Sequence, residues 1–145
     1  MARLFSDLGF EVKLVLDADR NDLMAVLGDF SQLATGADAA VFYYAGHGVQ
    51  LAWRNFLLPV DADIDTEEDV PLQSMNLGTL LENMEEAKAG VNLVFLDACR
   101  DNPFARSWRS AVQGLAQMNA PSGSFIAFAT GPGSVAADGT GRNGI

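Results

Sequence analysis

Apolar residues recur along this chain with two different periods, and the changes between them predict its helices and strands. Two long segments repeat apolar residues every three or four positions, which is typical of helices with one buried face. The first begins after Asp19 and ends at Gly36, and the second begins after Asn76 and ends at Gly90. Asp19 and Asn76 are residues that cap helix N-termini. A short helix that ends at Gly9 completes the predicted helical set.

Four other segments have the patterns of strands. Residues 10–16 alternate between apolar and polar, which predicts a strand with one wetter face near a sheet edge. Residues 40–45 are apolar on both faces, as expected of a central parallel strand covered by helices. Residues 91–99 and 124–130 form two more apolar runs, which we interpret as strands of the same sheet.

The order of these elements predicts an α/β fold. Strands alternate with helices, which implies a mostly parallel sheet flanked by helices and joined by right-handed connections. Short apolar runs at residues 49–51 and 55–58 predict a small hairpin outside the main sheet. The chain of 145 residues is long enough for one domain with its own core. We therefore expect a single domain over residues 1–145.

Composition and net charge limit the kinds of partner that this chain can bind. The net charge is −10, which disfavours nucleic acid and anionic membranes because their phosphates would repel the chain, and favours a basic peptide. No apolar stretch approaches the roughly 18 residues of a membrane span, and the first residues lack a signal pattern. We expect a soluble protein, cytoplasmic or periplasmic. The single cysteine excludes an internal disulfide.

The candidate chemistry lies in one histidine and one cysteine, each directly after an apolar run. If the strands that end at His47 and Cys99 are parallel neighbours, these residues meet at the sheet edge where open α/β sheets bind ligands. A thiol needs a nearby base to react at neutral pH, so this pair predicts a cysteine nucleophile with its base. The N–H groups of Gly48 and Cys99 would hold the oxyanion. Gly46 and Gly48 would let the backbone turn sharply beside the imidazole.

Four sequence blocks together resemble bacterial caspase-like peptidases, close to metacaspases. They are Tyr-Tyr-Ala-Gly-His-Gly at 43–48, Leu-Leu-Pro-Val-Asp-Ala at 57–62, Asp-Ala-Cys-Arg-Asp-Asn-Pro at 97–103 and Ala-Thr-Gly-Pro-Gly-Ser-Val-Ala at 129–136. A caspase signature is Gln-Ala-Cys, then Arg, Gln or Gly, then Gly, with a histidine about 50 residues upstream. Here the separation is 99 − 47 = 52 residues, while Asp97 and Asp101 replace the glutamine and the final glycine. The resemblance implies a three-layer caspase-haemoglobinase fold and a cysteine endopeptidase with a His47–Cys99 dyad.

The resemblance also implies a substrate. In the family, the position two before the nucleophile lines the pocket for the residue that precedes the scissile bond, and Asp97 occupies it here. A carboxylate at that position favours arginine or lysine, so the expected partner is a peptide or protein with a basic residue before the cut. Alternatively, Asp97 is a structural carboxylate that accepts backbone N–H groups. Relatives also have a first strand, a second pocket acid and C-terminal elements that this chain lacks, so we expect a fragment.

No cofactor is expected. The acidic residues between Asp61 and Asp69 are most simply a solvated surface, although some metacaspases need calcium and this region offers oxygen ligands. Arg106 and Arg109, after the nucleophile strand, are candidate self-cleavage sites. The alternative to a peptidase is a non-catalytic scaffold or interaction domain. A third interpretation is a doubly wound domain that binds a small ligand, which the sheet topology alone supports.

Overall fold

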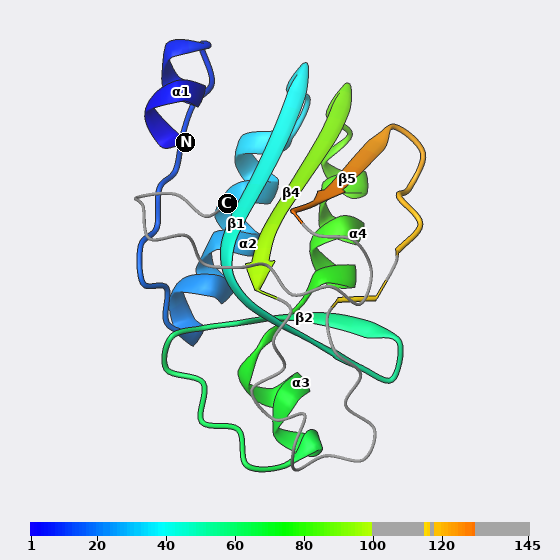
Figure 1. Ribbon diagram of the computed structural model, residues 1–145. Coiled ribbons are helices and arrows are strands. Elements are labelled where there is room, and N and C mark those ends of the chain that lie inside the picture. The colour runs from blue at the N-terminus through cyan, green and yellow to red at the C-terminus, as the bar shows by residue number, and fades with distance from the viewer. Residues whose placement is uncertain (100–114, 117, 130–145) are drawn as a thin grey trace.

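The computed structural model describes residues 1–99, 115–116 and 118–129, and a five-stranded mixed sheet lies at its centre (Figure 1). The strand order is β3-β2-β1-β4-β5. Three strands run parallel to one another, namely β1 (Ala39–Leu51), β4 (Val91–Cys99) and β5 (Ser124–Phe128). Two antiparallel strands extend the sheet beside β1, namely β2 (Arg54–Leu58) and β3 (Met75–Asn76). The predicted α/β class is confirmed, and β1, β4 and β5 form the parallel part of the sheet.

Two long helices pack on one face of this sheet, and both start at the predicted caps. Asp19 and Asp22 form a reciprocal capping box at the start of α2 (Arg20–Ala34). The side chain of Asn76 accepts the N–H of Gly78 at the start of α4 (Leu77–Ala87), which ends earlier than the predicted Gly90. The second helical layer expected of a three-layer arrangement does not fall within the described residues. In the main core, both helices pack against alternate residues of β1 and β4. The residues of this core include Leu23, Leu27, Phe42, Leu80, Met84, Val94 and Leu96.

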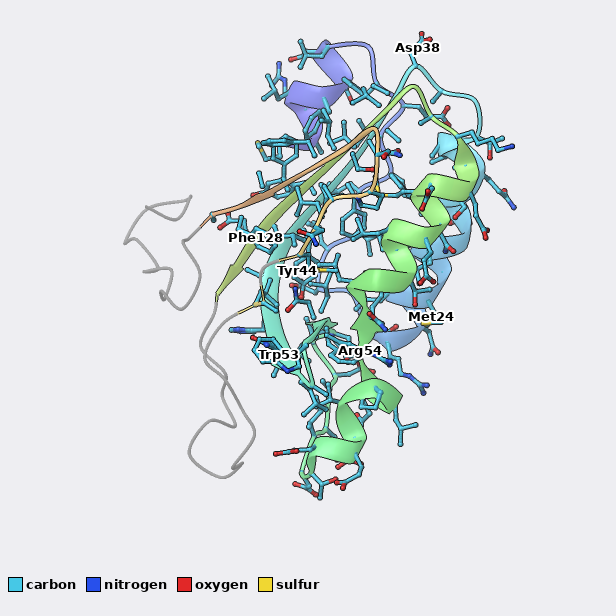
Figure 2. All side chains as sticks on the ribbon, turned by 90° about the vertical axis from the view of Figure 1, so that its right-hand side faces the viewer. Met24, Asp38, Tyr44, Trp53, Arg54 and Phe128 are labelled. Atoms are coloured by element: carbon cyan, nitrogen blue, oxygen red, sulfur yellow. The ribbon has the colours of Figure 1, made fainter. Side chains whose placement is uncertain are left out.

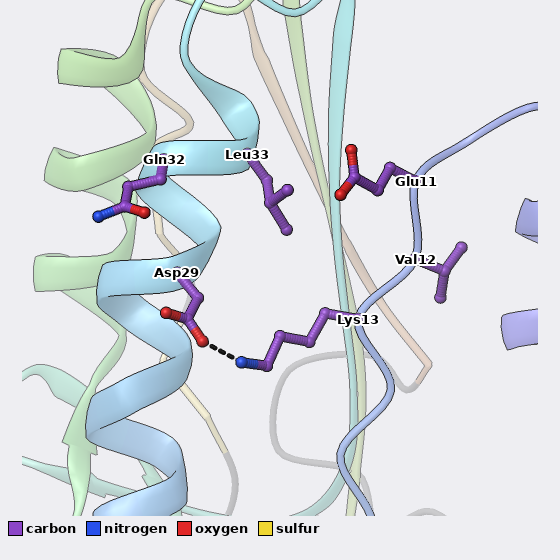
Figure 3. Close-up of a pocket in the computed structure, with 6 residues that line it drawn as sticks. All are labelled: Glu11, Val12, Lys13, Asp29, Gln32 and Leu33. Atoms are coloured by element: carbon purple, nitrogen blue, oxygen red, sulfur yellow. Dashed lines mark hydrogen bonds and ion pairs between the residues drawn. The ribbon is translucent and has the colours of Figure 1, made fainter.

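The helix α1 (Ala2–Asp7) is followed by Leu8 and then by the predicted Gly9, which has a φ of +90°, but the segment after it is not a strand. The prediction of a strand at residues 10–16 is wrong. A cleft of about 910 Å³ lies between this segment, α2 and β1. The ion pair of Lys13 with Asp29 ties the segment to α2 at a smaller, adjoining pocket (Figure 3). Alternation determines which side chains face water, but a strand also needs an adjacent edge for its backbone hydrogen bonds.

Strand β1 is much longer than predicted and continues into the hairpin. Its first half contains the predicted run 40–45, and its second half pairs with β2 in the same sheet. The prediction that the hairpin lies outside the main sheet is therefore wrong. Its two-residue turn consists of Ala52 and Trp53, with φ values of +48° and +65°, as in turns that match the strand twist. β1 curves at this end, so that the hairpin crosses below β4 in the view of Figure 1.

The acidic loop contains two short helical turns that the sequence did not predict, η1 (Glu67–Asp69) and α3 (Val70–Gln73). Val70 is completely buried, and it packs with Phe56, Leu58 and Ile64 in a second, smaller core beneath the hairpin. The loop is thus attached to the sheet by apolar contacts in spite of its charge.

Some predicted features lie outside the described residues. They are the candidate self-cleavage sites Arg106 and Arg109, the end of the 97–103 block after Cys99, and most of the glycine-rich block at 129–136. In the part of the chain that the structure describes, no helix combines the length and the apolar character needed to cross a bilayer.

Candidate active site

The ends of β1 and β4 bring the histidine and the cysteine of this chain into register. His47 pairs with Cys99 at the last position of the parallel ladder, and neighbouring strands lie about 4.8 Å apart. On its other side, His47 pairs with Leu58 in the antiparallel ladder to β2. Among the described strands, His47 is the one residue of β1 with partners on both sides. Its backbone is therefore held from two directions, while its side chain is exposed.

The hydroxyl of a partly buried tyrosine supports the backbone at this point. Tyr44 lies on the helix side of the sheet (Figure 2), where its hydroxyl is 2.8 Å from the carbonyl oxygen of His47 and 2.9 Å from that of Leu58. Gly46, two positions along β1, leaves the space for it, because a Cβ atom there would be 2.6 Å from the hydroxyl oxygen. Burial raises the pKa of Tyr44 to about 12, so the hydroxyl remains a donor at neutral pH.

Gly48 is also required for space. A Cβ atom at Gly48 would lie 2.9 Å from Cδ2 of Leu115. Neither Gly46 nor Gly48 has a positive φ, so the prediction that these glycines make a sharp turn is wrong. The segment at Leu115 is held by Asn55 on β2, whose amide accepts the N–H of Ala116 at 2.6 Å and donates to its carbonyl at 2.9 Å.

Asp97 lies on the same exposed face as His47 and contacts a second tyrosine. Asp97 pairs with Ala45, two positions before His47, so their side chains share one face of the sheet. The hydroxyl of Tyr43 donates to Oδ2 of Asp97 at 3.1 Å. Burial, and then the hydrogen bond and charge of Asp97, raise the pKa of Tyr43 above its ordinary value of 10.0. The structure thus brings the predicted residues His47 and Asp97 together on one surface, with Cys99 in register beside them.

Sequence similarity places this chain in a known family. A family model described as the caspase domain matches residues 1–145. The chain belongs to the caspase family. It is 30% identical over 100 residues to mucosa-associated lymphoid tissue lymphoma translocation protein 1 of Homo sapiens, and equally to the homolog of Mus musculus. The match covers 69% of this chain but 12% of each relative, so the chain spans only a small part of their length.

The family match confirms the caspase-like α/β fold and membership of a peptidase family, as the four sequence blocks implied. Peptidases of this kind act on protein substrates. The roles of His47, Cys99, Gly48 and Asp97 remain predictions.

The acidic loop of this caspase domain uses several of its carboxylates as structural acceptors. Asp61 accepts the N–H of Arg20 at 2.9 Å. Asp69 accepts both the N–H and the hydroxyl of Thr66, each at 2.8 Å, and the backbone hydrogen bond is the main reason why the pKa of Asp69 is lowered. Among the residues that the structure describes, no three His, Cys, Asp or Glu side chains gather as a metal site would require.

Two residues of the site, Tyr43 and Tyr44, were not predicted from the sequence. The available signal was the pair of tyrosines inside an otherwise apolar run, because a buried tyrosine hydroxyl needs a hydrogen-bond partner. Nothing in the pattern indicated which partners they have. The pairing of Asn55 with Ala116, across 61 residues of chain, had no sequence signal at all.

Proposed function

We propose that this caspase domain is a cysteine endopeptidase in which Cys99 is the nucleophile and His47 the base. The observation that carries the proposal is the register of His47 with Cys99 at the end of two parallel strands. His47 is also exposed, so that a substrate can approach the imidazole. An imidazole beside a thiol raises the thiolate fraction near neutral pH, which makes the sulfur nucleophilic.

In the proposed reaction, His47 takes the thiol proton while the sulfur of Cys99 bonds to the carbonyl carbon of the substrate. The N–H groups of Gly48 and Cys99 are proposed to stabilise the oxyanion that forms. The C–N bond then breaks, and the proton passes from His47 to the leaving amine. Water next attacks the thioester and gives a proton to His47, which returns it to the thiolate as the carboxylic acid product leaves.

We further propose that Asp97 directs cleavage to peptide bonds that follow arginine or lysine. Its carboxylate is exposed on the same face of the sheet as His47, and a basic side chain would bind it with charge-assisted hydrogen bonds. The net charge of −10 also favours a basic substrate over an acidic one.

Fluorogenic peptides that differ only in the residue before the cut test this function. The full chain should cleave the arginyl and lysyl peptides and leave the aspartyl peptide almost intact. His47→Ala should lower kcat by about 10²- to 10⁴-fold, the usual contribution of a general base. Asp97→Asn should lower kcat/KM for basic peptides by about tenfold to a hundredfold, through loss of a charged hydrogen-bond partner. Met24→Ala, on the exposed side of α2, is the control and should be unchanged.

Chemical labelling separates a peptidase from a non-catalytic interaction domain. A peptidyl-arginine chloromethyl ketone should alkylate Cys99 much faster than free cysteine at pH 7, and His47→Ala should slow the labelling. Labelling at the free-cysteine rate, unaffected by His47→Ala, would reject the peptidase and favour the interaction domain. Efficient turnover of aspartyl peptides with none of arginyl peptides would reject the proposed specificity.

A further inference from the structure

The exposed sheet face beside His47 carries an aromatic ring in direct contact with a carboxylate. The hydroxyl of Tyr43 on β1 donates to Oδ2 of Asp97 on β4, at 3.1 Å. Tyr43 precedes His47 by four positions, and Asp97 pairs with Ala45 between them, so the three side chains lie on one face. A ligand that reaches Asp97 along this face therefore also meets the ring of Tyr43.

Asp97 keeps most of its capacity to accept hydrogen bonds. A carboxylate offers about four lone-pair positions, of which the Tyr43 hydroxyl uses one. Asp97 is exposed, and across residues 1–99, 115–116 and 118–129 no lysine or arginine forms an ion pair with it. Its charge is available to a cation from outside this part of the chain.

The position of Asp97 suits a long basic side chain. Asp97 precedes Cys99 by two residues, a rise of about 6.6 Å along a parallel strand. A substrate residue whose carbonyl carbon meets the Cys99 sulfur must therefore extend its side chain by several ångströms to reach Asp97. Arginine and lysine are long enough for this, so length alone does not distinguish them.

We propose that Tyr43 is a specificity-determining residue that makes this site prefer arginine to lysine; the inference rests on the peptidase function proposed above. A planar guanidinium forms two parallel hydrogen bonds with Asp97 while it stacks on the ring of Tyr43. The ammonium of lysine is a compact, strongly hydrated charge, which forms no such paired bonds and gains less from the ring.

The hydroxyl of Tyr43 has a separate part in this arrangement. It holds Oδ2 of Asp97 next to the ring, so that the carboxylate and the ring face the same ligand. The raised pKa of Tyr43 keeps this hydroxyl protonated throughout the neutral range. Tyr43→Leu should therefore remove most of the arginine preference, whereas Tyr43→Phe should keep the ring and weaken the binding of both side chains.

A binding experiment that needs no turnover tests this inference. Blocked arginine amide and blocked lysine amide are titrated into the full Cys99→Ala chain and followed by NMR. The arginine amide should bind about tenfold more tightly, within the range of a desolvated cation–π contact. Tyr43→Leu should reduce the ratio to about two, and Tyr43→Phe should leave it above about five. Phe125→Leu removes another exposed aromatic ring of the sheet and should not change the ratio.

The outcomes distinguish this inference from the function on which it rests. Equal affinity for the two ligands, no binding of either, or an arginine preference that survives Tyr43→Leu in a folded chain would overturn the role of Tyr43. If Tyr43→Leu does not fold, Tyr43→Phe decides the question, because this variant keeps the ring. An arginine-to-lysine affinity ratio of one in Tyr43→Phe overturns the role of the ring. A Tyr43-dependent preference in a chain that cleaves no peptide would reject the peptidase and retain the arginine site.

Discussion

Replacing Tyr44 by phenylalanine removes a single oxygen atom at the point where β1 is paired on both sides. That oxygen lies 2.8 Å from the carbonyl of His47 and 2.9 Å from the carbonyl of Leu58, which are register partners. One hydroxyl proton is thus shared by two acceptors on neighbouring strands. The substitution leaves the ring and its packing in place, so its effect reports on the hydroxyl.

The expected size of the effect follows from these contacts. A hydrogen bond contributes a net 0.5–1.5 kcal/mol or so, and an acceptor left unsatisfied in the interior costs roughly 1–3 kcal/mol. Tyr44 is partly buried, so water can replace some of the lost interaction. We expect the free energy of unfolding to fall by about 1–2 kcal/mol. We also expect a several-fold loss of kcat, limited because His47 keeps both of its strand partners.

Gly46→Ala perturbs the same contact from the other side. Its Cβ would lie 2.6 Å from the hydroxyl oxygen of Tyr44 and 2.8 Å from Cζ, so the ring has to move. Such overpacking costs about 1–3 kcal/mol. Because both substitutions disrupt the same hydrogen bonds, the double variant should be about 1 kcal/mol more stable than the sum of the two losses predicts.

Urea denaturation of the two single variants and the double variant measures these quantities. The slope against urea should not change, because the folded state remains equally compact. Met24→Leu, on an exposed helix position, is the control and should stay within about 0.5 kcal/mol of the parent chain. A loss below about 0.3 kcal/mol in Tyr44→Phe, or full additivity with Gly46→Ala, would refute the reasoning.

Three further predictions concern the same region. Because burial raises the pKa of Tyr44 to about 12, its stabilising contribution should be complete below pH 10 and lost as the pH rises to 12. The stability difference between the parent and Tyr44→Phe should therefore shift by up to about 2.7 kcal/mol across that window in urea titrations, and a constant difference would contradict this. Asn55→Leu should lower the free energy of unfolding by about 2–4 kcal/mol, because the N–H and carbonyl of Ala116 lose their partners; a loss below about 1 kcal/mol would show that water replaces them. Gly48→Ala should cost about 1–2 kcal/mol through its contact with Leu115, and a Leu115→Ala background should remove most of that cost.

The helices were predictable because their signals are local. The side chains of Asp19 and Asn76 bond to N–H groups two or three residues away, and the apolar repeat identifies the buried face of each helix. The apolar runs before His47 and Cys99 were predictable for a similar reason, since a continuous run of apolar residues is a local signal of a core strand.

The errors arose where structure depends on a distant partner. Residues 10–16 have the alternation of a strand, but a cleft lies between them and β1, and no described strand pairs with them. The apolar runs indicate the hairpin but not its place in the main sheet. The pattern does not reveal that β1 continues through His47 and curves into the hairpin. The pattern does not show that Gly46 provides space and not a turn, because the group that needs the space is the hydroxyl of Tyr44.

The sequence by itself determined the fold class, the family and the candidate residues His47, Cys99 and Asp97. The fold class follows from short-range patterns, the family and Asp97 from the resemblance of four sequence blocks, and His47 and Cys99 from their places after apolar runs. Only the tertiary structure decided that His47 is paired on both sides and that Tyr43 contacts Asp97. Such contacts join residues far apart in the chain, and they depend on strand register, which the pattern of apolar residues does not specify.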